Sequence, residues 1–108
     1  MNFTLGKEYR ILVNGVLMPA NIHEWGRWFS NPDNRRVGED VIGDVRVSTV
    51  CLGSDHSFGG GEPLWFETMI FGGEYDEYMW RYSTLEQAKA GHARVVDAVK
   101  NDTVGDLD

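Results

Sequence analysis

The chain has 108 residues, of which 42% are hydrophobic and 12% aromatic, enough to build one small folded domain but not two. Its formal charge of −7, from 17 acidic against 10 basic residues, argues against nonspecific binding to nucleic acid or to an anionic membrane surface. We therefore expect one domain over residues 1–100 and an acidic, disordered tail over residues 101–108.

The sequence also bears on where the protein works. Cys51 is the single cysteine, so no intrachain disulfide can form, which suits a reducing cytoplasm. No apolar run reaches the roughly 18 residues that a membrane span needs. The start, "MNFTLGKEYR", lacks the features of a signal peptide. These features predict a soluble cytoplasmic protein.

The first predicted element is a β-hairpin over Tyr9–Met18. Two β-prone runs flank Asn14 and Gly15, a pair that tolerates the positive φ angles of a type I′ turn. Pro19 is expected to end the hairpin.

A short helix is predicted within residues 21–30, "NIHEWGRWFS". Asn21 can cap its first N–H groups, and Glu24, three residues later, completes a capping box. Its apolar stripe is expected to dock on a sheet.

Three strands follow, over residues 44–52, 64–71 and 78–82. The second is apolar on both faces apart from Glu67 and Thr68, which indicates a central strand or an oligomer interface. A homodimer is therefore possible.

The last predicted element is the longest helix. Ser83 and Glu86 form an S-x-x-E capping box, and apolar residues recur at helical spacing as far as Val99. Gly91 should weaken this helix by about 1 kcal/mol relative to alanine. The order of hairpin, helix, three-stranded meander and helix predicts an α+β fold, with helices packed on an antiparallel sheet.

The segment "GSDHSFGGGEP", residues 53–63, is too long for an ordinary hairpin turn and is the first candidate site. Its glycines permit close backbone approach to a ligand, and its Asp-His pair could act as acid, base or metal ligand. A flexible connection fits the composition equally well. The candidate residues are Asp55, His56, Phe58, Gly59, Gly60 and Gly61.

Outside this loop, the candidates are arginines, one acid and one tryptophan. Arg35 and Arg36 suit bidentate contacts to an anion, although pairing with neighbouring acids is the commoner role. Glu67 interrupts an apolar strand and needs a partner, for which Arg46 or Arg81 is available. Trp80 is a further candidate binding residue.

Catalytic and metal motifs are not apparent. The chain has no P-loop, C-x-x-C pair, G-x-S-x-G elbow or dinucleotide fingerprint, and no cofactor follows from the sequence. His23-Glu24 does not begin an H-E-x-x-H motif, because Arg27 occupies the second histidine position. His92 lies on the apolar stripe of the last helix, where a hydrogen-bonded core role is favoured.

The chain resembles a family of short uncharacterised proteins encoded by tailed phages and prophages. The resemblance covers about residues 21–99 and lies in the strings "WGRWF", "RRV", "GDVRVSTVCLGSDHSFGGGEPLWFETMIFGG" and "WRYSTLEQAKAGHARVV". It implies a phage gene expressed inside a bacterial host, and it implies no catalytic residues.

Three hypotheses for function remain. The first is an accessory protein that binds a host or phage protein stoichiometrically, through residues 53–63 with Arg35, Arg36 and Trp80. The second is a small-molecule binder in which the two arginines hold a nucleotide or another anion. The third is an enzyme with His56 as general base, oriented by Asp55, and Glu67 as a second acid.

Overall fold

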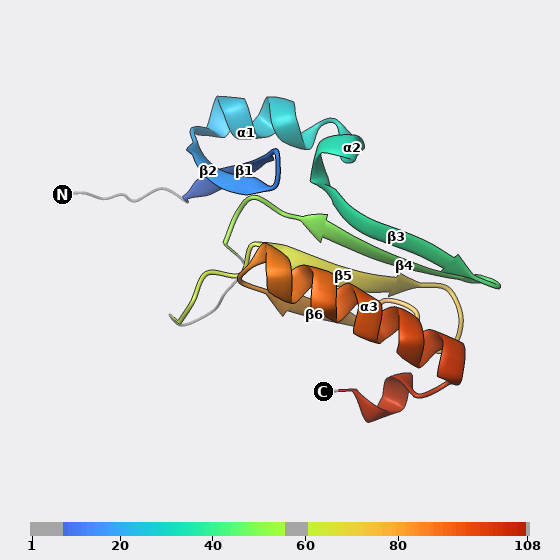
Figure 1. Ribbon diagram of the computed structural model, residues 1–108. Coiled ribbons are helices and arrows are strands. Elements are labelled where there is room, and N and C mark those ends of the chain that lie inside the picture. Colours follow the sequence, from blue (N-terminus) through green and yellow to red (C-terminus); the bar gives the residue numbers. More distant parts are fainter. Residues whose placement is uncertain (1–7, 56–60, 108) are drawn as a thin grey trace.

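The computed structural model describes residues 8–55 and 61–107 and has the predicted α+β fold (Figure 1). Its elements in chain order are β1 (Tyr9–Val13), β2 (Val16–Ala20), α1 (Ile22–Phe29), α2 (Pro32–Arg35), β3 (Arg36–Ile42), β4 (Val45–Cys51), β5 (Phe66–Phe71), β6 (Met79–Tyr82), α3 (Leu85–Asn101) and the short 3₁₀ helix η1 (Val104–Asp106).

The strands form two antiparallel sheets. β1 and β2 make a two-stranded hairpin, and β3, β4, β5 and β6 make a four-stranded meander in chain order. Helix α3 lies along one face of the larger sheet, while the hairpin and α1 sit together at one end of it (Figure 1).

The hairpin forms as predicted, with Asn14 at φ 52° and Gly15 at φ 82° in its turn. The expectation that Pro19 ends the hairpin is wrong, because β2 continues to Ala20 and Pro19 pairs with Arg10. A proline is tolerated there because β2 is an edge strand, whose outward N–H groups are not needed by a neighbour.

The predicted capping box of α1 is confirmed. Asn21 Oδ1 accepts from the Glu24 N–H at 2.8 Å, and Glu24 Oε1 accepts from the Asn21 N–H at 2.9 Å. The helix packs mainly on the hairpin rather than on the large sheet, with the Trp28 indole N–H donating to the Leu12 carbonyl at 3.2 Å. The Trp25 indole reaches further and donates to the Leu52 carbonyl at 3.1 Å.

Besides the short helices α2 and η1, the sequence did not predict strand β3. Its charged residues Arg36, Glu39 and Asp40 break the alternation expected of a strand, and its register shifts between Arg36 and Gly38. Gly38 is needed because a Cβ there would lie 3.0 Å from the His92 ring. Charge is common on such edge strands, where it blocks pairing with other chains.

The N-cap of helix α3 lies one residue after the predicted N-cap, Ser83. Thr84 is the N-cap, and Gln87 rather than Glu86 completes the capping box. In this arrangement Gln87 Oε1 accepts from the N–H groups of both Ser83, at 3.0 Å, and Thr84, at 3.2 Å. One acceptor thus satisfies two backbone donors that would otherwise lack a partner.

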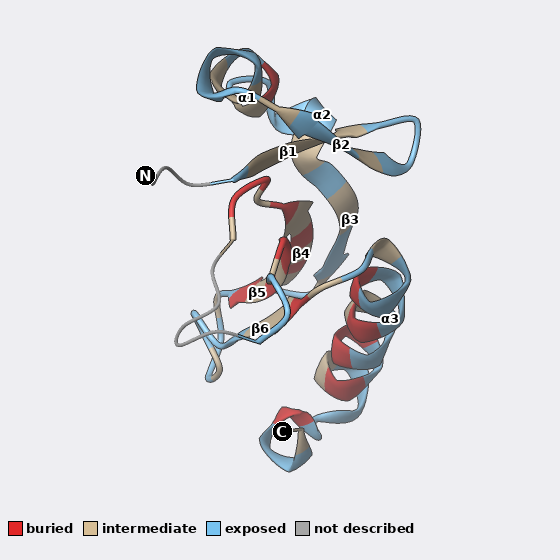
Figure 2. Cartoon of the chain, turned by 90° about the vertical axis from the view of Figure 1, so that its left-hand side faces the viewer, coloured by how far each residue is buried: buried red, intermediate tan, exposed pale blue. Residues whose placement is uncertain are grey.

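The core has two clusters, one beneath α1 and the hairpin and one beneath the second half of α3 (Figure 2). Val47, Ile70 and Val95, each at most 1% exposed, belong to the second. Val104 of η1 joins that cluster and is 3% exposed. The segment predicted as a disordered tail therefore contains a packed 3₁₀ helix.

Candidate functional site

The described part of residues 53–63 is held by structural contacts. The Arg10 N–H donates to the Gly53 carbonyl at 2.8 Å, and a β-bridge joins Tyr9 to Ser54. Asp55 Oδ1 accepts from the Leu64 N–H at 2.8 Å. Asp55 therefore ties the two ends of the loop together.

Four candidates in this loop, His56, Phe58, Gly59 and Gly60, lie outside the described residues. Gly61 is described and has φ +90°, a backbone conformation that favours glycine. Of the predicted Asp-His pair, the structure therefore describes only Asp55, which accepts from the Leu64 N–H.

The two adjacent arginines have different neighbours. The Arg35 guanidinium stacks 4.2 Å above the Phe29 ring. Arg36 forms ion pairs with Asp33 at 2.7 Å and Glu39 at 3.1 Å. The hydrogen bond and charge of Asp33 raise the pKa of Arg36 above its ordinary value. Arg36 is thus neutralised within the chain.

Glu67 has the predicted partner, because Arg81 on the neighbouring strand lies 3.1 Å away. Both side chains are largely buried, the glutamate 14% and the arginine 25% exposed. This arrangement is the buried ion pair that a carboxylate within an apolar strand was expected to form.

Trp80 lies on the face of the sheet that α3 covers, opposite Thr68. Its strand β6 and the strand that carries Arg36, β3, are the two edges of the sheet. The binding surface that the sequence suggested, which combined these residues, is therefore divided between opposite edges.

A chain of hydrogen bonds that the sequence did not reveal runs from the surface into the core. Asp40 Oδ2 lies 2.7 Å from His92 Nε2, and His92 Nδ1 lies 2.7 Å from Thr49 Oγ1. The hydroxyl of Thr49 is hydrogen-bonded to that of Thr68, which also accepts from the Tyr82 hydroxyl at 3.1 Å. These five residues come from five different elements, so no local pattern links them.

The order of carboxylate, imidazole and hydroxyl is that of a nucleophilic triad. Thr49 and Thr68 are both 0% exposed, however, so a substrate has no access to either hydroxyl. This series of hydrogen bonds instead gives partners to polar groups that would be costly to bury alone. It confirms the prediction that His92 is a hydrogen-bonded core histidine.

One surface suited to binding is the face of the large sheet opposite α3, which we call the open sheet face. Along each strand its residues alternate with those that α3 covers, and the strand register places them side by side. They are Glu39, Val41, Arg46, Ser48, Val50, Glu67, Met69, Phe71, Met79 and Arg81.

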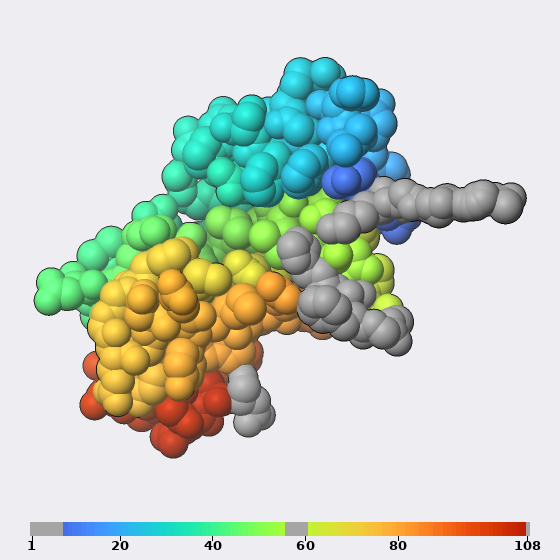
Figure 3. Space-filling model, turned by 180° about the vertical axis from the view of Figure 1, so that it is seen from behind, coloured from blue at the N-terminus to red at the C-terminus, as the bar shows by residue number. Residues whose placement is uncertain are grey.

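The open sheet face combines exposed apolar side chains with charges that are already paired. Val41 is 69%, Met79 46% and Phe71 36% exposed. The Arg46 guanidinium lies 4.2 Å above the Phe71 ring and 3.7 Å from Glu39. Figures 1 and 2 show α3 on the other side of the sheet, and Figure 3 views the molecule from behind, away from α3.

Comparison with known proteins gives no relative for this chain: no family model, curated protein or solved structure matches it. Within residues 8–55 and 61–107, no helix is both long and apolar enough to cross a membrane. The same residues contain no group of three or more metal-ligating side chains placed to hold an ion.

Proposed function

We propose that the chain is a small accessory protein of the kind that phages and prophages encode, and that it acts by stoichiometric binding to a host or phage protein in the bacterial cytoplasm. The observation that supports this proposal is the open sheet face. A sheet face turned to water is usually polar. Here Val41, Phe71 and Met79 are exposed together on one such face.

The composition of this face is suited to contact with a protein. Phenylalanine, methionine and arginine are enriched at protein interfaces, and arginine is frequent among the residues that contribute most binding energy. Met69 pairs with Ser48 of β4 and Met79 of β6, and Phe71 pairs with Arg46 of β4. Glu67 and Arg81 form an ion pair on the same face. We expect the partner to present an apolar centre with a polar margin.

A binding role is favoured over catalysis because both described acids that the sequence suggested for catalysis are engaged in contacts within the chain. Glu67 is paired with Arg81, and Asp55 closes its loop. A joint anion site at Arg35 and Arg36 is disfavoured because Arg36 would have to leave its ion pairs with Asp33 and Glu39.

A charge placed on the open sheet face should abolish binding. We expect wild-type protein to retain a partner from a phage-infected host lysate at a fixed ratio, and Phe71→Glu/Met79→Glu to lose it, because a buried unpaired carboxylate opposes association. Quantitative mass spectrometry of the captured material measures this.

Met18→Glu is the matched control, because Met18 has the same 46% exposure as Met79 but lies on the hairpin. If Met18→Glu loses the partner and the double variant retains it, the partner binds the hairpin and not the open sheet face. Sedimentation of the purified wild type reports whether the chain self-associates instead.

A further inference from the structure

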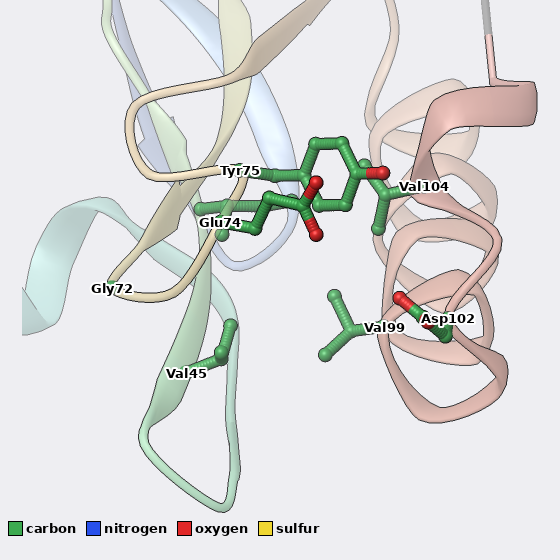
Figure 4. A pocket seen from close by; sticks show the side chains of 8 residues that line it. Val45, Gly72, Glu74, Tyr75, Val99, Asp102 and Val104 are labelled. Carbon is green, nitrogen blue, oxygen red and sulfur yellow. The ribbon is translucent and has the colours of Figure 1, made fainter.

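A pocket of about 110 Å³ opens between the start of β4, the turn after β5 and the end of α3 (Figure 4). Its walls include four aliphatic side chains, a tyrosine ring and two carboxylates. The lining side chains are Val45, Ile70, Glu74, Tyr75, Val99, Asp102 and Val104. None of them belongs to the open sheet face.

The walls of the pocket are fixed by the core. Ile70 and Val104 belong to the second core cluster and are 1% and 3% exposed. Gly72, at φ +92°, passes so close to the Asp44 carbonyl that a Cβ would lie 2.6 Å from its oxygen. The pocket is therefore preformed, which lowers the entropic cost of filling it.

The charge around the pocket is negative from two independent sources. Glu74 and Asp102 are exposed at its mouth, and no ion pair joins either to a Lys or Arg in the described chain. The C-terminus of the 17-residue helix α3 also ends here, with Asp102 as its cap, and helix C-termini carry partial negative charge.

The pKa of Tyr75 is shifted by the same negative charges. The charge of Glu74 is the main cause that raises the pKa of Tyr75 above its ordinary value, with burial and Asp102 contributing next. A phenol that resists ionisation marks a place where an added negative charge is unfavourable and a positive one is favoured.

We propose that this pocket binds a primary alkylammonium group, with the cation between Glu74 and Asp102 and the methylene chain against Val45, Val99 and the Tyr75 ring. An engineered cavity of about 150 Å³ holds benzene, so a pocket of about 110 Å³ fits a chain of about four or five non-hydrogen atoms. The Tyr75 ring adds an aromatic face for the cation.

The same features exclude other ligands. Anions are repelled by both carboxylates and by the helix terminus, and a planar ring system is larger than the pocket. The site is separate from the open sheet face, so this inference stands or falls independently of the proposed function.

The test is an NMR titration of ¹⁵N-labelled protein with n-butylamine at pH 7, where the amine is protonated. We expect saturable shifts confined to amides of residues 70–75 and 99–104, and none with butyrate, which has the same length and the opposite charge. Shifts that do not saturate, or equal shifts with n-butanol, would overturn the proposal.

Glu74→Gln/Asp102→Asn should weaken n-butylamine binding by at least about tenfold, because charge-assisted contacts are lost. Glu86→Gln/Asp97→Asn makes the same change in net charge at exposed positions of α3 outside the pocket and should bind as the wild type does. Equal weakening in both variants would show that only the overall charge matters, against the proposal.

A parallel titration with N-acetyl-lysine methylamide identifies the source of the amine. Binding of both probes supports a pocket that accepts a lysine side chain of another protein, and binding of n-butylamine alone supports a free amine. If neither probe binds, the proposed alkylammonium site is wrong. Phe71→Glu/Met79→Glu should bind n-butylamine normally, which separates this result from the partner assay.

Discussion

At the scale of single residues, Gly91 illustrates how context reverses a sequence rule. A glycine inside a helix usually lowers stability, so the sequence marks it as a weak point. In the structure, a Cβ at this position would lie 2.2 Å from the hydroxyl oxygen of Tyr82. Gly91 is therefore what allows α3 to approach β6 closely.

The two helical glycines should respond oppositely to alanine. We expect Gly91→Ala to destabilise the protein by about 1–3 kcal/mol, because the buried Tyr82 ring must move. Gly26→Ala in α1 has no atom within 4 Å of its new Cβ and should stabilise by up to about 1 kcal/mol. Urea unfolding measures both, and stabilisation by Gly91→Ala would contradict the packing described here.

The burial of the Cys51 thiol leads to a second prediction at the scale of single residues. Burial raises the pKa of its thiol to about 12 from an ordinary value of 9.0. Because the unfolded thiol ionises first, its contribution to stability is complete below pH 9 and is lost as the pH rises toward 12. The buried Tyr82, whose pKa is also raised, acts in the same direction.

We therefore expect the free energy of unfolding to fall as the pH rises above 9.0, and the fall to be smaller in Cys51→Ala. Urea titrations at several pH values provide the measurement. The native thiol should also resist alkylation at pH 8 and react once the chain is unfolded. Rapid alkylation of the native protein would contradict the burial of Cys51.

At the scale of elements, the hydrogen-bonded chain from Asp40 to Tyr82 joins β3, β4, β5, β6 and α3. Each hydroxyl in it depends on the next, so its bonds should be coupled. Its role is to fix how α3 sits on the sheet.

Thr49→Val should cost about 1–3 kcal/mol, because it leaves His92 Nδ1 without its partner in a buried place. We expect Thr49→Val/Thr68→Val to cost less than the two single changes together, since they share one bond. Thr103→Val, at an exposed position with no side-chain capping bond, is the control. Additive losses in chemical denaturation would argue against coupling.

Local patterns in the sequence predicted local structure well. The hairpin turn and the Asn21 capping box depend on neighbouring residues, and both formed as expected. The start of α3 was missed by one residue because Ser83 and Thr84 both head a capping pattern. Strand β3 was missed because its charges mark an edge strand, a property that depends on its place in the sheet.

The sites depended on long-range contacts and were harder to predict. The Glu67–Arg81 pair was among the predicted alternatives because the two residues lie on consecutive strands. The pocket joins residues from 45 to 104, and the open sheet face needs both the register and the position of α3. No spacing rule in one sequence gives these.

At the scale of the whole molecule, α3 lies on one face of a four-stranded sheet, and no helix among residues 8–55 and 61–107 packs on the other face. The protein has a net charge of −7, but on the open sheet face two arginines, Arg46 and Arg81, balance two glutamates, Glu39 and Glu67. The excess of acids therefore lies elsewhere on the chain. This face therefore adds no net charge that would repel an acidic partner.

The most direct test of this account is photo-crosslinking in a bacterial host, with a crosslinking amino acid placed at position 79 or, as the control, at position 18. The two methionines are equally exposed, so they sample solvent alike. We expect position 79 to give one discrete crosslinked species of fixed mass and position 18 to give none. No crosslink at position 79, or the same crosslinks at both positions, would contradict binding through the open sheet face.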